Sequence, residues 1–285
     1  MTAKPPLPRV AGVVGWPVGH SLSPLIHQIW AGREGLDAVY LPVAAEPGYE
    51  AFARAAEALR NAGFRGLNVT LPHKENALAY AQAASAAAKK AGAANMLTFG
   101  PDGPYADNSD IAGFAAALAG VLRPGEIPAC AVVLGAGGAA RGVVLALKEL
   151  GIGEIIIANR TAEKAERLAK ELGARAAGWE ERAPALEGAG LLVNATSLGM
   201  DSASALDIAL GALPADAIVA DIVYRPLQTP LLAAARAQGL RAADGLSMLM
   251  HQAAAGYKAW LGTTAEVDAD LRRRLEAALD EGKTR

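Results

Sequence analysis

A short polar segment in the first third of the chain, Asn68-Val-Thr70-Leu-Pro-His-Lys74, combines hydrogen-bonding and ionisable side chains. Asn68 and Thr70 are two positions apart, and in a strand such positions face the same side. Lys74 follows where the strand would turn into a helix, a place from which a long side chain can turn into a cleft. An isolated lysine is more commonly a solvated charge, so this segment by itself leaves both interpretations open.

Two serines in the loop Gly19–Pro24 form a second candidate site. Ser21 and Ser23 are closely spaced hydroxyls, which can hold a carboxylate or the hydroxyls of a small ligand. Ser23 has an alternative role as the N-cap of a helix, because Pro24 suits the first helical position. The loop is therefore compatible with ligand binding and with helix capping alike.

Polar residues also stand next to later expected strands and helices. In Asp107–Asp110 one side chain is needed to cap the following helix, and the others remain as acceptors for a ligand. Asp221–Tyr224 follows an apolar run, and in α/β sheets ligands bind at this end of the strands. Asp244–Gln252 opens an expected helix, where Gly245 allows close approach.

A glycine-rich turn is the strongest local signal in the chain. The apolar run Ala131–Leu134 leads into Gly135-Ala-Gly-Gly-Ala-Ala140, after which a helical pattern begins. In a dinucleotide-binding turn the first glycine permits the bend, the second admits the pyrophosphate, and the third position needs a small residue for packing. The helix start adds free N–H groups and the positive end of the helix dipole. A turn required only by packing is the alternative interpretation.

The end of the next expected strand bears on which dinucleotide binds. NAD enzymes commonly place a carboxylate there for the ribose 2′-hydroxyl, whereas this chain has Asn159-Arg160-Thr161. A carboxylate would repel a 2′-phosphate, and a guanidinium can pair with it. These residues therefore favour NADP over NAD, unless Arg160 is only a solvated surface charge.

The elements that must position these residues follow from the apolar periodicity. In the first third the pattern predicts strands over Arg9–Trp16, Ala38–Val43, Gly66–Thr70 and Ala94–Phe99, and helices over Leu25–Glu34, Tyr49–Ala62 and Lys74–Ala91. Beyond Asp107 it predicts strands over Cys130–Leu134, Glu154–Ala158, Gly190–Asn194 and Ala217–Asp221, and helices ending at Leu122 and over Ala139–Leu150, Ala162–Leu172, Pro230–Gln238, Ser247–Leu261 and Val267–Glu281. This alternation favours βαβ units and mainly parallel sheets. Two α/β domains are the simplest arrangement.

The composition excludes several classes of protein. Among 285 residues, 27 Lys and Arg stand against 29 Asp and Glu, and the net charge of −2 gives no support for a nucleic-acid partner. No apolar run reaches the roughly 18–20 residues of a membrane span, and Met1–Val10 is not followed by the apolar core of a secretory signal. The lone Cys130 excludes an internal disulfide, and the four histidines have no metal-ligand spacing. We therefore expect a cytoplasmic protein without a metal site.

Taken together, the polar segments resemble those of the shikimate dehydrogenase family, in the same order and over nearly the whole chain. The segments that carry the resemblance are Gly15–Pro24, Asn68–Lys74, Ala93–Asn95, Asp107–Asp110, Gly135–Arg141, Asn159–Thr161, Asn194–Ser197, Tyr224–Pro230 and Asp244–Gln252. One such motif is weak evidence, whereas this many in register are highly specific. The resemblance implies two α/β domains with the substrate in the cleft between them. It implies a substrate domain with a mainly parallel sheet over residues 1–108 and 246–285, and a Rossmann-like NADP domain over residues 109–245.

The resemblance also implies a reaction and a role for each matching residue. The reaction is the reversible NADP-dependent oxidation of shikimate to 3-dehydroshikimate, on the route to chorismate and the aromatic amino acids. Lys74 and Asp110 would be the catalytic pair. The substrate would be bound by Ser21, Ser23 and Tyr224 at its carboxylate and by Thr70, Asn95 and Gln252 at its ring hydroxyls. The cofactor would be bound by Gly135, Ala136, Gly137, Gly138 and Ala139 at its pyrophosphate, by Asn159, Arg160 and Thr161 at its 2′-phosphate, and by Ile222 and Gly245 near its nicotinamide.

Three positions depart from the family pattern. The family usually has threonine where this chain has Met96, Thr-Asp-Gly where it has Ser109-Asp110-Ile111, and often an acidic residue near Ala86. Ser109 keeps a hydroxyl, whereas Met96 removes one beside a substrate contact. Ile111 adds a branched side chain next to Asp110. These changes bear on substrate range and rate rather than on the fold.

Two alternative functions stay open beside the one that the resemblance implies. One is a quinate/shikimate dehydrogenase, or a paralogue of altered substrate, and Arg160 argues against the NAD that quinate enzymes commonly use. The other is a non-catalytic nucleotide-binding regulatory module, which the joint presence of Lys74, Asp110, Asn95 and Gln252 disfavours. We expect shikimate or 3-dehydroshikimate as the small-molecule partner, no nucleic acid or membrane partner, and a monomer or homodimer. Whether Lys74 acts as a base or as an electrostatic stabiliser stays open.

Overall fold

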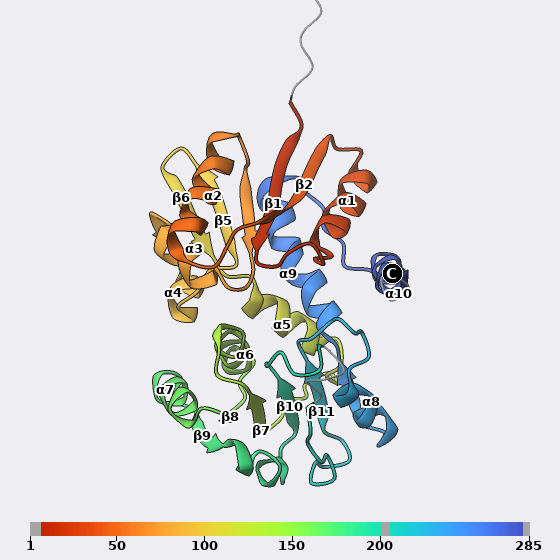
Figure 1. Ribbon diagram of the computed structural model, residues 1–285. Helices are drawn as coiled ribbons and strands as arrows, with labels where there is room; N and C mark the ends of the chain where they lie inside the picture. The colour runs from red at the N-terminus through yellow and green to blue at the C-terminus, as the bar shows by residue number, and fades with distance from the viewer. Residues whose placement is uncertain (1–6, 201–205, 282–285) are drawn as a thin grey trace, which may run out of the picture. The chain divides into compact units, whose positions relative to one another are not determined.

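The computed structural model describes residues 7–200 and 206–281, and the chain divides into two compact units. The first unit takes the chain up to Ser109 together with Gln252–Leu275. The second takes Asp110–His251 and the chain from Glu276 onward. Each unit is built on its own six-stranded sheet with helices packed on it (Figure 1). The α/β class and the presence of two α/β units are as the sequence predicts.

The first unit has a mainly parallel sheet in the order β2-β1-β3-β5-β6-β4. Its strands are β1 (Arg9–Gly15), β2 (Ala38–Ala44), β3 (Gly66–Val69), β4 (Ala83–Ala84), β5 (Met96–Gly100) and β6 (Gly103–Asp107). Strand β5 alone runs against its neighbours β3 and β6. The helices are α1 (Ser23–Glu34), α2 (Tyr49–Asn61), α3 (Lys74–Tyr80) and α4 (Ala86–Ala91), with the C-terminal part of α9 (Gly245–Trp260) and the N-terminal part of α10 (Ala269–Glu281).

Side-chain alternation along β3 explains how helices cover this sheet. Leu67 lies in a buried apolar cluster with Phe52 and Ala56, two residues of α2 that are one helical turn apart. Gly66 precedes Leu67 and faces the other side, where α9 packs: a Cβ at Gly66 would lie 2.2 Å from Nε1 of Trp260. That indole N–H donates to the Thr98 hydroxyl at 2.9 Å. The absence of a side chain at Gly66 therefore lets α9 approach the sheet.

One predicted helix in the first unit is wrong. The alanine-rich stretch 74–91 is not continuous, because the backbone is extended at Ala81, with φ −72° and ψ 144°, and the chain then forms β4. Ser85 ends this break by accepting a hydrogen bond from the Ala88 N–H at 3.0 Å, as the N-cap of α4. The prediction was wrong because it rested on the helix propensity of the alanines. It took no account of the Ser85 cap or of the pairing of β4 with β6.

The second unit has an entirely parallel sheet in the order β12-β11-β10-β7-β8-β9. Its strands are β7 (Cys130–Leu134), β8 (Glu154–Asn159), β9 (Arg175–Gly178), β10 (Leu191–Asn194), β11 (Ile218–Asp221) and β12 (Arg241–Ala243). Its helices include α5 (Asp110–Ala119), α6 (Gly138–Glu149), α7 (Ala162–Leu172) and α8 (Pro230–Ala237), besides two short 3₁₀ turns at Trp179–Glu181 and Pro184–Leu186. The central strands are buried and mostly apolar, as expected of a parallel sheet covered on both faces, and β10 and β11 each end on a buried polar residue, Asn194 and Asp221.

The strand order of the second unit reverses at β7, next to the glycine-rich turn. Strand β7 pairs with β8 on one side and with β10 on the other, so the strand order reverses at β7. In open parallel sheets, ligands bind outside the carboxyl ends of the strands at such a reversal. The glycine-rich turn follows β7 directly, which puts it at that position.

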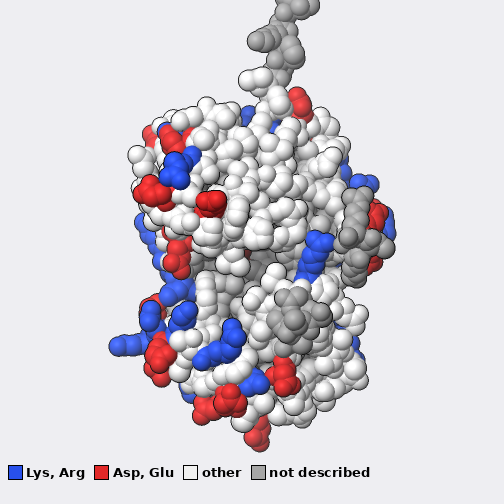
Figure 2. Space-filling model, viewed as in Figure 1, with Lys and Arg blue, Asp and Glu red and all other residues white. Residues whose placement is uncertain are grey.

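The charged side chains at the surface reflect the nearly equal numbers of acidic and basic residues in the sequence. Figure 2 shows acidic and basic side chains close together on the visible faces rather than gathered by sign. Within residues 7–200 and 206–281, no helix is long and apolar enough to cross a membrane. The strands β6, β9 and β12 are additions to the predicted elements, and each is short and at or near a sheet edge.

Candidate functional site

The first unit places Thr70 and Lys74 on one tight turn. Strand β3 ends at Val69, one residue earlier than predicted, so Thr70 begins the turn rather than facing the same side of the strand as Asn68. The Thr70 carbonyl accepts from the His73 N–H at 2.9 Å, and Lys74 is the first residue of α3. His73 is fully buried and its Nε2 lies 2.9 Å from the Ala45 carbonyl, which anchors the turn.

The two serines before α1 have different roles. The helix begins at Ser23 with Leu22 at the N-cap and without a side-chain cap, so the alternative role of Ser23 as N-cap is wrong. Instead the Ser21 hydroxyl accepts from the Ser23 N–H at 3.2 Å. Ser21 is half-buried and Ser23 is buried, and the two serines stand on either side of the N-cap residue Leu22.

Asn95, Ser109 and Gln252 form a hydrogen-bonded polar cluster in the first unit. The Asn95 Nδ2 donates to the Gln252 Oε1 at 3.1 Å and to the Ser109 hydroxyl at 3.0 Å. The Asn95 Oδ1 accepts from the Ser109 backbone N–H at 2.8 Å. Since a backbone N–H can only donate, this last bond sets the orientation of the Asn95 amide. The cluster brings together two of the predicted substrate-binding residues, and it adds Ser109, which sequence reasoning set aside as a neutral change.

The remaining residues predicted for catalysis and substrate binding belong to the second unit. Asp110 is buried and is the first residue of α5, whereas Lys74 lies in the first unit. A Cβ at Gly142 would lie 3.7 Å from the Asp110 Cβ, so α6 packs close to the start of α5 at this glycine. Tyr224 is half-buried and follows β11 by three residues.

The glycine-rich turn has the geometry of an anion cradle. Gly135 has φ +107°, and a Cβ there would lie 3.0 Å from the Ala195 carbonyl oxygen, so both backbone and space require glycine. Gly137 is the N-cap of α6 and offers no side chain to the helix N–H groups. At Gly137 and Gly138 a Cβ would meet nothing within 4 Å, so the backbone at the helix start borders open space. Free N–H groups beside open space fit a pyrophosphate.

The end of β8 presents polar groups without a carboxylate. The Asn159 Nδ2 donates to the Thr161 carbonyl at 2.9 Å, which holds the loop before α7. Thr161 is the N-cap of α7, but its hydroxyl makes no cap bond. Arg160 between them is exposed, and no hydrogen bond or ion pair holds its guanidinium within the described part of the chain. The loop therefore offers an exposed positive charge to an anionic group.

Ile222 and Gly245, predicted to lie near the nicotinamide, are in direct contact. A Cβ at Gly245 would lie only 2.3 Å from the Ile222 carbonyl oxygen, so no other residue fits there. The contact joins the loop after β11 to the start of α9. The group that closely approaches Gly245 is therefore the Ile222 carbonyl of the same chain.

A buried carboxylate network that sequence reasoning missed supports the loops after β10 and β11. Asp221 is 2 % exposed and accepts from Asn194 Nδ2 at 2.9 Å, from the Val223 N–H at 3.0 Å and from the Thr229 hydroxyl at 2.7 Å. These donors favour the charged form, but burial outweighs them and raises the pKa of Asp221 to about 6. An aspartate at the end of an apolar strand, followed by Thr229 before a proline, was the signal available in the sequence.

Two family models match the chain, one in each of its two units. A family model described as the shikimate dehydrogenase substrate binding domain matches residues 13–97, and one described as shikimate / quinate 5-dehydrogenase matches residues 127–200. The chain is 47% identical to a shikimate dehydrogenase (NADP(+)) of Acidiphilium cryptum over 95% of its own length and 97% of the relative's.

Solved structures of the same fold extend the comparison. A shikimate 5-dehydrogenase from Thermus thermophilus in complex with NADP(H) and shikimate superposes with a TM-score of 0.83 at 37% identity, over 96% of this chain and 99% of the other. A quinate dehydrogenase from Corynebacterium glutamicum in complex with NAD superposes with a TM-score of 0.87 at 27% identity, over 95% and 100%. One fold thus serves two substrates and two cofactors, and the site residues must decide between them.

Proposed function

The chain belongs to the shikimate dehydrogenase family, and from that premise we propose that it catalyses the reversible oxidation of shikimate by NADP⁺ to 3-dehydroshikimate and NADPH. In the biosynthetic direction it reduces 3-dehydroshikimate, on the route to chorismate and the aromatic amino acids. The observation that carries this proposal is the 47% identity to an NADP-dependent shikimate dehydrogenase over 95% of the chain. The chain is accordingly an oxidoreductase with a Rossmann-like unit.

We place the substrate on the first unit, with residues 1–108 and 246–285 as its functional domain. The cluster of Asn95, Ser109 and Gln252 supports this, because side-chain amides both donate to and accept from ring hydroxyls. Thr70 contributes a hydroxyl from the turn after β3. Ser21 and Ser23 supply hydroxyls for the substrate carboxylate. Tyr224, a residue of the second unit, is the third residue proposed to bind that carboxylate.

We place NADP on the second unit, with residues 109–245 as its functional domain. The N–H groups at Gly137, Gly138 and Ala139 suit the pyrophosphate, since the start of α6 is uncapped by side chains and borders open space. Gly135 and Ala136 shape the approach to this cradle, and Ile222 and Gly245 border the nicotinamide position.

The choice of NADP over NAD rests on the loop after β8. Asn159, Arg160 and Thr161 bring one positive charge and two neutral polar groups, where an NAD site commonly carries a carboxylate. Arg160 pairs with the 2′-phosphate, and the N-terminal end of α7 adds a favourable dipole.

The mechanism assigns proton transfer to Lys74. When bound, NADP⁺ supplies the acceptor for the hydride from the carbon bearing the reacting hydroxyl. Lys74 moves the proton of that hydroxyl, for which it must come within about 3 Å of the oxygen. In the reductive direction its ammonium donates the proton and stabilises the negative charge that develops on the oxygen. Asp110 is the proposed partner that orients this ammonium.

The discriminating experiment measures initial rates with shikimate and with quinate, each with NADP⁺ and with NAD⁺. We expect shikimate with NADP⁺ to give the highest kcat/KM of the four combinations. Preference for quinate with NAD⁺ would identify the chain as a quinate-type enzyme instead. Inactivity in all four assays would favour a paralogue of altered substrate or a nucleotide-binding regulatory module. We also propose a cytoplasmic location and a monomeric or homodimeric state, which gel filtration with light scattering can resolve.

A further inference from the structure

A buried tyrosine in the first unit is linked to the proposed substrate cluster by hydrogen bonds. Tyr40 lies on the edge strand β2 and is only 8 % exposed. Its hydroxyl donates to the Oδ1 of Asn68 on β3 at 2.7 Å. Strand β1 lies between β2 and β3, so the long phenol side chain spans it to reach Asn68.

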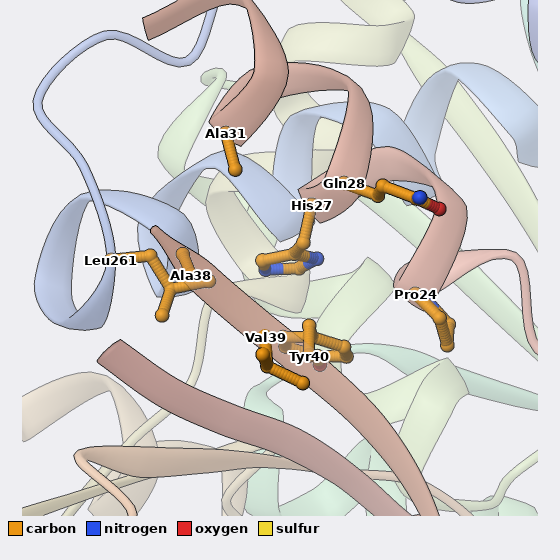
Figure 3. Close-up of a pocket in the computed structure, with 8 residues that line it drawn as sticks. All are labelled: Pro24, His27, Gln28, Ala31, Ala38, Val39, Tyr40 and Leu261. Carbon is orange, nitrogen blue, oxygen red and sulfur yellow. The ribbon is translucent and has the colours of Figure 1, made fainter. Parts of the chain in front are cut away.

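The ring of Tyr40 is held in place from its outer side. His27 of α1 stacks on it with ring centroids 3.7 Å apart and planes inclined by 16° (Figure 3). The His27 Nδ1 lies 2.8 Å from the Ser23 carbonyl, which orients the imidazole along α1. Both rings line a pocket of about 290 Å³ that also includes Gln28 and Leu261. Ring packing therefore fixes the orientation of the phenol independently of the hydrogen bond that its hydroxyl makes.

Asn68 connects Tyr40 to the proposed substrate cluster through two hydrogen bonds. Its Oδ1 accepts from Tyr40, and its Nδ2 donates to the main-chain carbonyl of Asn95 at 3.2 Å. A Cβ at Gly256 would lie 3.1 Å from the Asn68 Oδ1, so α9 also covers this amide, one turn beyond Gln252. Asn68 is 4 % exposed, and its two polar atoms have opposite partners, which leaves one orientation for the amide.

Asn95 belongs to both hydrogen-bonded groups. Its main chain bonds the Tyr40–Asn68 pair, and its side chain bonds Ser109 and Gln252. On one side its carbonyl accepts from Asn68, and on the other its side-chain amide bonds Ser109 and Gln252. A shift of this backbone moves the amide that we assign to a substrate hydroxyl. Precise placement of a binding group depends on such supporting bonds.

We propose that Tyr40 and Asn68 are positioning residues for shikimate, which act by holding the Asn95 main chain and thereby its side-chain amide. This inference rests on the proposed function, since it assumes that Asn95 binds a ring hydroxyl. Neither residue touches the substrate in this scheme. Their loss affects substrate affinity and leaves the proton transfer by Lys74 and the cofactor site unaffected.

The test compares steady-state constants of Tyr40→Phe with those of the wild type. Tyr40→Phe keeps the stacked ring and removes only the hydroxyl, so we expect the KM for shikimate to rise about 3- to 10-fold, as for one lost hydrogen bond. We expect kcat and the KM for NADP⁺ to stay within about 2-fold. Tyr80→Phe is the matched control, because the Tyr80 hydroxyl donates to Glu57 at 2.7 Å in the same unit without a link to Asn95.

A double-mutant cycle distinguishes positioning from a general loss of stability. Asn68→Ala should raise the KM for shikimate at least as much as Tyr40→Phe, and Tyr40→Phe should add nothing in the Asn68→Ala background. Melting curves establish that each variant is folded at the assay temperature. If Tyr40→Phe is unfolded there, the KM of Asn68→Ala is compared with the wild type instead. An unchanged KM in Tyr40→Phe, an equal rise in Tyr80→Phe, or additive effects in the double variant would overturn the proposal. A wild-type enzyme inactive on shikimate would overturn the proposed function, and this inference with it.

Discussion

The Asn95 side chain donates to the Oε1 of Gln252 at 3.1 Å, although 157 positions separate the two residues in the chain. The bond joins the start of β5 to α9 and places two amides side by side. Each amide has both donor and acceptor atoms, so the pair can rearrange its bonds around a ring that carries hydroxyls. We take this pair as the centre of the substrate site.

Replacement of Gln252 by alanine tests that assignment. We expect Gln252→Ala to raise the KM for shikimate about 3- to 10-fold, because one hydrogen bond to the substrate and one to Asn95 are lost. The KM for NADP⁺ should not change. Gln28→Ala is a suitable control, since Gln28 is an exposed glutamine of α1 in the same unit. Equal shikimate KM values in the wild type and Gln252→Ala would remove Gln252 from the site.

Lys74→Ala should act on kcat rather than on KM. Loss of a positioned proton donor typically costs about 10²–10⁴-fold in rate, so we expect a decrease in kcat of that order. Initial rates in both directions of the reaction measure it. Lys90→Ala, at an exposed position of α4, should keep the wild-type rate. Near-wild-type turnover in purified Lys74→Ala would show that another group moves the proton.

Arg160→Gln should reduce the preference for NADP⁺. A guanidinium–phosphate pair is a charge-assisted interaction, and its loss should raise the KM for NADP⁺ roughly 10-fold or more while the KM for NAD⁺ stays unchanged. Arg167→Gln serves as the control, because Arg167 is an exposed arginine of the neighbouring helix α7. If both cofactors are affected alike, Arg160 does not recognise the 2′-phosphate.

Asp221 should make the second unit less stable as the pH rises. Burial raises its pKa in the folded state to about 6 from an ordinary value of 3.8, so the folded state binds more protons than the unfolded state between these values. The stabilisation is complete below about pH 4 and is lost as the pH rises through 6, by about 2 kcal/mol. Urea unfolding at pH 4 and pH 7 should show this loss in the wild type relative to Asp221→Asn, which does not titrate. A constant difference between the two proteins across this range would contradict the assignment.

His27 should have the opposite dependence in the first unit. Burial lowers its pKa to about 4 from 6.5, so the unfolded state binds more protons between these values and stability falls as the pH is lowered. Between pH 7 and pH 5 the wild type should lose about 2 kcal/mol relative to His27→Phe, which keeps a ring against Tyr40. Unfolding curves of the two proteins at both pH values measure the difference. Parallel changes in both proteins would mean that His27 is protonated in the folded state.

Features that depend on a few neighbouring residues were accessible from the sequence. The path from β7 through Gly135 into α6 was predicted because the bend, the open helix start and the small residues are all local requirements. The continuous helix over Lys74–Ala91 was wrong because Ser85 and the pairing of β4 with β6 outweigh the alanine propensity. The alternative role of Ser23 as the N-cap of α1 was wrong because the helix begins at Ser23 itself, with Leu22 at the N-cap.

By itself, then, the sequence determined two α/β units, a glycine-rich turn after β7 and the cationic end of β8, because strand and helix periodicity, glycine conformation and charge type are properties of short segments. Only the tertiary structure decided which polar residues meet. It brought Tyr40 to Asn68, and Asn95 to Ser109 and Gln252, across 14 to 157 positions of chain. It also decided the pKa of Asp221, since burial depends on every element packed around the carboxylate. Contacts between distant segments and removal from water arise only on folding, and neither is encoded in the spacing of any one motif.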